Sequence, residues 1–130
     1  FDHATDEFHN SVGLGRAYRE RANCSTFAVE SHITYDAEVK AGAAVVCRTR
    51  LLGCDDKRIH YFHTMHHAEE GFLAATTELL GVHVDLSIRR VAPMPADIQS
   101  RLAATLARHG AWPRPKQVGR VIEIRPRDRG

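Results

Sequence analysis

The sequence lacks the features that mark membrane and secreted proteins. No apolar run approaches the ~20 residues that a transmembrane helix needs, and no stretch has the pattern of a signal peptide. The formal net charge is only +2 at pH 7, which on its own does not indicate binding to nucleic acid. We therefore expect neither a membrane nor nucleic acid among the partners.

Cysteine is also scarce. The three cysteines, Cys24, Cys47 and Cys54, are an odd number and form no C-x-x-C pair. A disulfide framework or a zinc ribbon needs paired cysteines at suitable spacing, so this pattern argues against both. It favours a reducing compartment, and we expect a cytoplasmic protein.

Several motifs that would identify an enzyme class are missing as well. The sequence contains no G-x-S-x-G nucleophile elbow, no phosphate-binding G-x-x-x-x-G-K loop and no dinucleotide-binding G-x-G-x-x-G loop. Serine hydrolases of the elbow type and proteins with these nucleotide-binding loops are therefore not indicated.

What the sequence does contain is the composition of one ordered domain. It has 130 residues, of which 43% are hydrophobic and 26% charged, enough to bury a core without disulfides. We assign residues 1–110 to this domain. Residues 111–130 hold three of the five prolines and an excess of basic residues. They predict a loosely attached basic tail, with residues 121–124 as an alternative sheet edge.

Hydrophobic periodicity predicts two helices and four strands. The helices are expected at residues 1–12 and 95–109, and the strands at residues 27–39, 43–52, 59–67 and 72–85. Gly13 is expected to end the first helix, residues 14–23 to form an irregular connection with up to one helical turn, and Gly81 to mark a bulge or bend. Short turns between strands predict an antiparallel meander covered by the first helix.

The segment 27–39 alternates in the way that a half-buried strand requires. Its apolar side chains share one parity, and they are Phe27, Val29, Ile33, Tyr35 and Val39. Glu30 and His32 share the other parity, so a strand would place a carboxylate and an imidazole side by side on its polar face. We expect the apolar row to face the core.

Glu30 and His32 are the candidate catalytic residues. A carboxylate and an imidazole that reach the same ligand suit general-base or nucleophilic chemistry at a carbonyl carbon. The alternative is that both side chains pair with basic residues of the following strand, such as Arg48 or Arg50.

Histidine is concentrated in one strand, where four of the nine histidines lie at positions 60, 63, 66 and 67. On a helix His63 and His67 would be four residues apart and could share a metal ion. On a strand the same two residues are about 13 Å apart, which is too far for one ion. We therefore predict no metal site and keep a histidine-rich metal-binding protein as an alternative.

Lys57 and Arg58 lie in the turn between the second and third predicted strands. Two cations at a hairpin tip suit the phosphates of a nucleotide-bearing substrate, although solvated turn residues are an equal alternative. Aromatic side chains are available for a cage around a quaternary ammonium, or alternatively for the core, and they are Tyr35, Tyr61, Phe62 and Trp112.

Several segments of residues 1–95 resemble one family. They are Phe1-Asp-His-Ala-Thr-Asp6, Val29-Glu-Ser-His-Ile-Thr-Tyr35, Asp56-Lys-Arg-Ile-His-Tyr-Phe-His63, Glu70-Gly-Phe-Leu-Ala-Ala-Thr76, His83-Val-Asp85 and Arg89-Arg-Val-Ala-Pro-Met-Pro95. The chain resembles hotdog-fold acyl-CoA thioesterases of the 4-hydroxybenzoyl-CoA thioesterase-like superfamily, and within it the betainyl-CoA thioesterases of carnitine degradation.

The resemblance implies an α+β hotdog fold, in which a long helix packs on an antiparallel sheet. It implies a homodimer joined through sheet edges, with no cofactor and no metal, that hydrolyses a short acyl-CoA such as betainyl-CoA. In such a fold we expect Glu30 and His32, the catalytic candidates from the strand pattern, to face the cleft, and Lys57, Arg58, His60 and Tyr61 to bind the substrate.

One motif of the family is absent. Its Asp-x-x-Gly-His-x-Asn segment maps to no position here, because it lies on the first strand and the turn before the helix that begins near Phe1. We expect that the first strand was trimmed from the sequence, and otherwise Glu30 must supply the carboxylate. A non-catalytic hotdog module that binds acyl groups or serves in assembly stays open as an alternative function.

Overall fold

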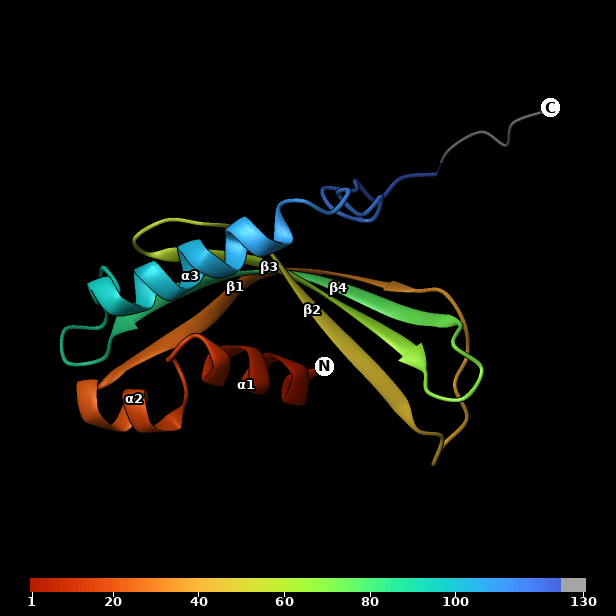
Figure 1. Ribbon diagram of the computed structural model, residues 1–130, viewed down its shortest axis with the longest axis horizontal. Helices are drawn as coiled ribbons and strands as arrows, with labels where there is room; N and C mark the ends of the chain where they lie inside the picture. Colours follow the sequence, from red (N-terminus) through yellow and green to blue (C-terminus); the bar gives the residue numbers. More distant parts are fainter. Residues whose placement is uncertain (125–130) are drawn as a thin grey trace.

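The computed structural model describes residues 1–124, which form three helices and one antiparallel sheet (Figure 1). The predicted α+β class is confirmed. The strands of the sheet are β1 (Cys24–Tyr35), β2 (Val45–Cys54), β3 (Arg58–His67), β4 (Leu73–Asp85) and the two-residue β5 (Arg90–Val91).

The strand order corrects the predicted meander. The order is β1-β4-β3-β2, with β5 paired to β4, so β1 pairs with β4 and not with β2. The meander is right for β2, β3 and β4, which tight turns connect. Residues 36–44, between β1 and β2, are too long for a two-residue hairpin, and they carry the chain to the far edge of the sheet.

The helices are α1 (Asp2–Ser11), α2 (Arg16–Ala22) and α3 (Ala96–His109). The two predicted helices are confirmed as α1 and α3. Gly13 follows α1 with a φ of 86°, the left-handed conformation that glycine adopts without strain. The connection that was predicted to hold up to one helical turn contains the seven-residue α2 instead.

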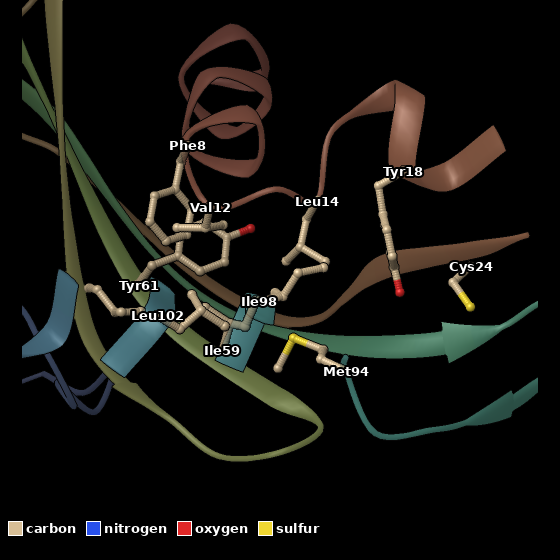
Figure 2. Close-up of a cluster of buried hydrophobic side chains, with 11 residues drawn as sticks. Phe8, Val12, Leu14, Tyr18, Cys24, Ile59, Tyr61, Met94, Ile98 and Leu102 are labelled. Carbon is tan, nitrogen blue, oxygen red and sulfur yellow. The ribbon is translucent and has the colours of Figure 1, made fainter. Parts of the chain in front are cut away.

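The core lies between α1 and one face of the sheet, with α3 along the outer edge of β2. The backbone N–H of Leu51 donates to His109 Nδ1 over 2.9 Å, which fixes α3 at that edge. Figure 2 shows Ile98 and Leu102 of α3 beside Tyr61 of β3. We call the side of the sheet under α1 the helix face.

A β-bulge in β1 overturns the predicted apolar row. Ala28 pairs with Gly81 and Glu30 with Leu80, so Val29 is the extra residue. The bulge reverses the parity, and Phe27 and Ile33 therefore lie on opposite faces of the sheet. Four of the five residues expected in the core are exposed, with 47% for Phe27, 57% for Val29, 45% for Ile33 and 86% for Tyr35.

The physical reason for this exposure is that β1 is an edge strand, which has a neighbouring strand on one side only.

Gly81 was the predicted bulge position, but it lies in regular pairing opposite the bulge. A Cβ at Gly81 would come within 3.0 Å of the Thr26 side chain, so the glycine permits close approach of the two strands. The strand also ends at Tyr35, earlier than the predicted Val39.

The segment after α3 crosses the other side of the sheet, which we call the tail face. The Arg50 guanidinium donates to the carbonyl oxygens of Trp112 and Pro113, and the Gly119 N–H donates to Glu78 Oε1 over 2.9 Å. The tail is thus attached at two points rather than loosely.

Residues 121–124 form no strand, so the alternative of an added sheet edge is wrong. The rest of the predicted tail, residues 125–130, lies outside the described residues. Across the described part of the chain, none of the helices has the length and apolar character that a membrane crossing requires.

Candidate active site

Three of the predicted site residues come together on the tail face. In the sheet, His32 of β1 lies opposite Glu78 of β4. Leu80 of β4 lies between Glu30 of β1 on one side and His60 of β3 on the other. They line a pocket of about 530 Å³, which the tail partly closes, together with Ser31, Leu79, Gly119, Arg120 and Val121. We call this the tail-face pocket.

Glu78 organises this pocket and was missed by the sequence reasoning. Its Oε2 lies 2.6 Å from His60 Nε2, and its Oε1 accepts the Gly119 N–H. Burial alone would raise the pKa of Glu78, but the hydrogen bonds from Gly119 and His60 outweigh it and lower the pKa. A carboxylate in the middle of a largely apolar strand was the signal that could have identified it.

Glu30 and His32 occupy the exposed rim of the tail-face pocket. Within the described part of the chain neither side chain has a hydrogen-bond partner, whereas both oxygens of Glu78 are engaged. The alternative pairing with Arg48 or Arg50 is wrong, because β4 and β3 lie between β1 and β2.

The other predicted residues, Lys57, Arg58 and Tyr61, do not line the tail-face pocket. Lys57 and Arg58 lie at the β2–β3 turn, where Arg58 forms a 2.6 Å ion pair with Asp55. The hydrogen bond from Arg58 lowers the pKa of Asp55. Arg58 and His60 line a neighbouring pocket of about 320 Å³. Tyr61 points to the helix face, where it is 2% exposed and packs against Phe8.

His63 lies on the helix face, opposite in orientation to His60. Its Nε2 is 2.9 Å from Thr5 Oγ1 and its Nδ1 is 2.7 Å from Thr49 Oγ1, so it connects α1 to β2. Burial lowers the pKa of His63 to about 4, and the ring is therefore neutral at pH 7. Among residues 1–124 no three His, Cys, Asp or Glu side chains are grouped as a metal would need.

A second concavity, which we call the α1 groove, lies on the helix face at the start of α1. It encloses about 570 Å³ and is mostly apolar, and its walls are Phe1, Ile33, Tyr35, Asp36, Ala37, Glu38, Val39, Met65, Ala74 and Ala75. Among residues 1–124, no side chain forms a capping hydrogen bond with the first turn of α1. The N–H groups of that turn form the positive end of the helix dipole, which suits an anion or a developing oxyanion.

Sequence reasoning missed the groove as a site, although it proposed Tyr35 for an aromatic cage. The groove brings Phe1 and Met65 to the side of Ile33 and Tyr35. This proximity depends on β1 pairing with β4, which the sequence did not predict. The α1 groove and the tail-face pocket are therefore chemically different concavities on opposite faces of one sheet.

Comparison with known proteins connects this fold to enzymes that act on CoA thioesters. The chain is 38% identical over 126 residues to a betainyl-CoA thioesterase of Pseudomonas aeruginosa, covering 97% of this chain and 79% of that protein. It is 34% identical over 122 residues to the L-carnitine dehydrogenase/betainyl-CoA thioesterase of Rhizobium meliloti, covering 94% of this chain and 24% of that one. The chain thus spans most of the first relative and about a quarter of the second.

Solved structures share the same fold. The hypothetical protein SAV2348 from Staphylococcus aureus, solved in complex with CoA, superposes with a TM-score of 0.86 at 28% identity, over 93% of this chain and 76% of that one. The 1,4-dihydroxy-2-naphthoyl-CoA thioesterase Slr0204 from Synechocystis has a TM-score of 0.67 at 18% identity. The match covers 78% of this chain and 75% of that chain, and at this identity it supports the fold alone. The sequence pattern of the thioesterase-like superfamily matches residues 1–102, and the chain belongs to this superfamily, with the predicted hotdog fold.

Proposed function

We propose that this protein hydrolyses a short acyl-CoA to the free acid and CoA, and that betainyl-CoA is its substrate. Membership in the superfamily supports thioester hydrolysis. The name of the Pseudomonas aeruginosa relative supports the betainyl group, and the CoA complex of the Staphylococcus aureus neighbour supports binding of the CoA part.

The observation that carries the proposal is the α1 groove. An acyl group in the groove brings its thioester carbonyl to the uncapped first turn of α1. Water attacks the carbonyl carbon, the oxygen becomes negative, and the backbone N–H groups of that turn stabilise the charge. A base takes the proton of the water, and the intermediate then expels the CoA thiolate, which is protonated.

The catalytic roles predicted for Glu30 and His32 stay predictions. Their pocket lies on the other face of β1 from the α1 groove. A base in that pocket acts on a thioester bound at the tail face, whereas a thioester in the groove must be hydrolysed on the helix face. The variant Glu30→Gln separates these two locations.

The test of the proposed function is hydrolysis of an acyl-CoA panel, followed through release of the CoA thiol. We expect turnover of betainyl-CoA, and slower turnover of acetyl-CoA and of 4-hydroxybenzoyl-CoA. Binding of acyl-CoA without turnover of any member would contradict an enzyme and favour a non-catalytic acyl-binding module.

We also propose that two copies join through the β1 edges. β1 is an edge strand of the sheet, and among the described residues its outer side has no partner strand. Phe27, Val29 and Ile33 are exposed on it, and an exposed apolar edge strand is a template for pairing with another chain.

Light scattering on the purified protein tests this assembly. We expect the mass of a dimer for the wild type and a shift toward the monomer for Val29→Lys, because a charge on the edge opposes strand pairing. The control is Val121→Lys, which places the same charge at an exposed position of the tail. A monomeric wild type would refute the dimer.

A further inference from the structure

We propose that the α1 groove is a subsite for a quaternary ammonium, which makes it the element that selects a trimethylammonium-bearing acyl group. This inference rests on the proposed function, since it concerns the acyl part of the CoA thioester. It adds the residues that distinguish a cationic acyl group from a neutral one of the same shape, and they are Tyr35, Asp36 and Glu38.

The first argument is the apolar wall. A trimethylammonium presents only methyl groups to its surroundings and has no N–H to donate. Ile33, Met65 and Ala75 line the groove with hydrocarbon and thioether atoms that suit these methyls. Tyr35 adds an aromatic ring that is 86% exposed, so its face is available to a cation.

The second argument is the sign of the charge. Asp36 and Glu38 are the only acidic side chains of the described lining, and no lysine, arginine or histidine belongs to it. Both carboxylates lie at exposed positions and form no ion pair within residues 1–124. The groove therefore combines apolar walls with two carboxylates that form no ion pair among the described residues.

The third argument is that Asp36 is held in place before any ligand binds. On the tail-face side of β1, the Thr34 hydroxyl donates to Asp36 Oδ2 over 3.0 Å. The backbone N–H groups of Asp36 and Ala37 both donate to the carbonyl oxygen of Ala74, over 2.9 and 3.1 Å. The two backbone bonds attach the segment to β4 and fix its backbone beside the groove before a ligand binds.

The groove also lacks what other acyl groups need. A hydroxylated aromatic acyl group would require donors and acceptors deep in the pocket, yet the only hydroxyl among the lining side chains is that of Tyr35. A long neutral alkyl chain would gain nothing from two carboxylates at the rim and would displace their water. The combination suits a short cationic acyl group best.

The experiment compares two substrates of nearly identical shape, betainyl-CoA and 3,3-dimethylbutyryl-CoA, in which carbon replaces the quaternary nitrogen. We expect the wild type to prefer betainyl-CoA by about tenfold or more in kcat/KM. In the double variant Asp36→Asn, Glu38→Gln this preference falls about tenfold, while kcat/KM for the neutral substrate changes less than threefold.

Two further variants complete the test. Tyr35→Leu lowers the preference and Tyr35→Phe retains it, because the ring face and not the hydroxyl meets the cation. Glu69→Gln, in the exposed turn after β3, is the matched control and leaves the preference unchanged. All variants are first compared with wild type by thermal unfolding.

The outcomes separate the subsite from the proposed function. If the wild type hydrolyses neither substrate, the proposed function fails. If it hydrolyses both and the double variant keeps the same preference, the function stands and the quaternary ammonium subsite is refuted. A wild type that prefers the neutral substrate refutes the subsite as well.

Discussion

On the helix face of the sheet His63 is buried and neutral, whereas on the tail face Glu78 is partly exposed and charged. His63 is fully buried between Thr5 and Thr49. On the other side of the same strand, His60 contacts the charged Glu78, and their side chains are 29% and 17% exposed. The two histidines are three residues apart in the sequence, yet their environments are opposite.

This difference shows what each face contributes. The helix face combines a packed core with an apolar groove at the positive end of α1, which favours binding of an acyl group and stabilisation of an oxyanion. The tail face uses its charged groups to attach residues 111–121 to the sheet. Five variants test this division, from the largest expected effect to the smallest.

Removing the Tyr61 side chain should have the largest effect. Tyr61→Ala leaves a cavity beneath α1, and we expect the free energy of unfolding to fall by about 3 to 5 kcal/mol. Chemical denaturation measures it, with Tyr35→Ala as the exposed control on the same face. A stable Tyr61→Ala protein that binds acyl-CoA weakly would restore the substrate role that the sequence predicted for Tyr61.

His63 should make stability depend on pH. Burial lowers its pKa from 6.5 to about 4 in the folded protein, so the unfolded chain binds more protons between these values. The free energy of unfolding is then constant above pH 6.5 and falls as the pH drops toward 4, by about 2 to 3 kcal/mol. Burial also lowers the pKa of His9, which adds in the same direction.

Denaturation of wild type and His63→Gln between pH 4 and 8 measures this effect. The variant should be less stable at pH 7, because glutamine replaces the two threonine contacts imperfectly, and its stability should depend less on pH. Equal pH dependence in both proteins would show that His63 is not the group responsible.

Glu78→Gln tests how the tail is attached. The variant loses the charge that His60 and the Gly119 N–H both contact, and we expect a loss of about 1 kcal/mol in stability. Limited proteolysis should cut residues 111–121 faster than in wild type, with Glu69→Gln as the control. Unchanged cleavage would mean that Arg50 alone holds the segment.

Lys57→Ala should weaken binding of the CoA phosphates modestly. We expect KM for the acyl-CoA to rise about threefold with kcat unchanged, because an exposed cation contributes little free energy. Arg58→Ala should have a smaller effect, since Arg58 is already paired with Asp55. Steady-state kinetics at low salt distinguishes the two, and an unchanged KM in Lys57→Ala would exclude the phosphate role.

Glu30→Gln should have the smallest effect on hydrolysis. Glu30 lies across β1 from the α1 groove, and we expect kcat/KM within about twofold of wild type. Loss of a base that acts in the reaction would instead cost about a hundredfold or more. A loss of that size would move the chemistry to the tail-face pocket and reverse the comparison of the two faces.

Part of the candidate site was predictable from local pattern. Glu30 and His32 do share a face, as their two-residue spacing requires, and His60 joins them there. Tyr61 could not join them, because adjacent residues of a strand point to opposite faces. The meeting of Glu78 with Glu30 and His32, and the α1 groove, were missed because both depend on β1 lying beside β4, a contact between residues at least 40 positions apart.

The sequence by itself determined which segments are helices and strands. Side-chain periodicity and glycine positions act over a few residues, so α1, α3 and four strands were predicted near their observed places. The tertiary structure alone decided the strand order, the bulge at Val29 and hence which side chains share a face. A one-residue change of register reverses every later side chain, and that register is set by the partner strand and not by the strand's own sequence.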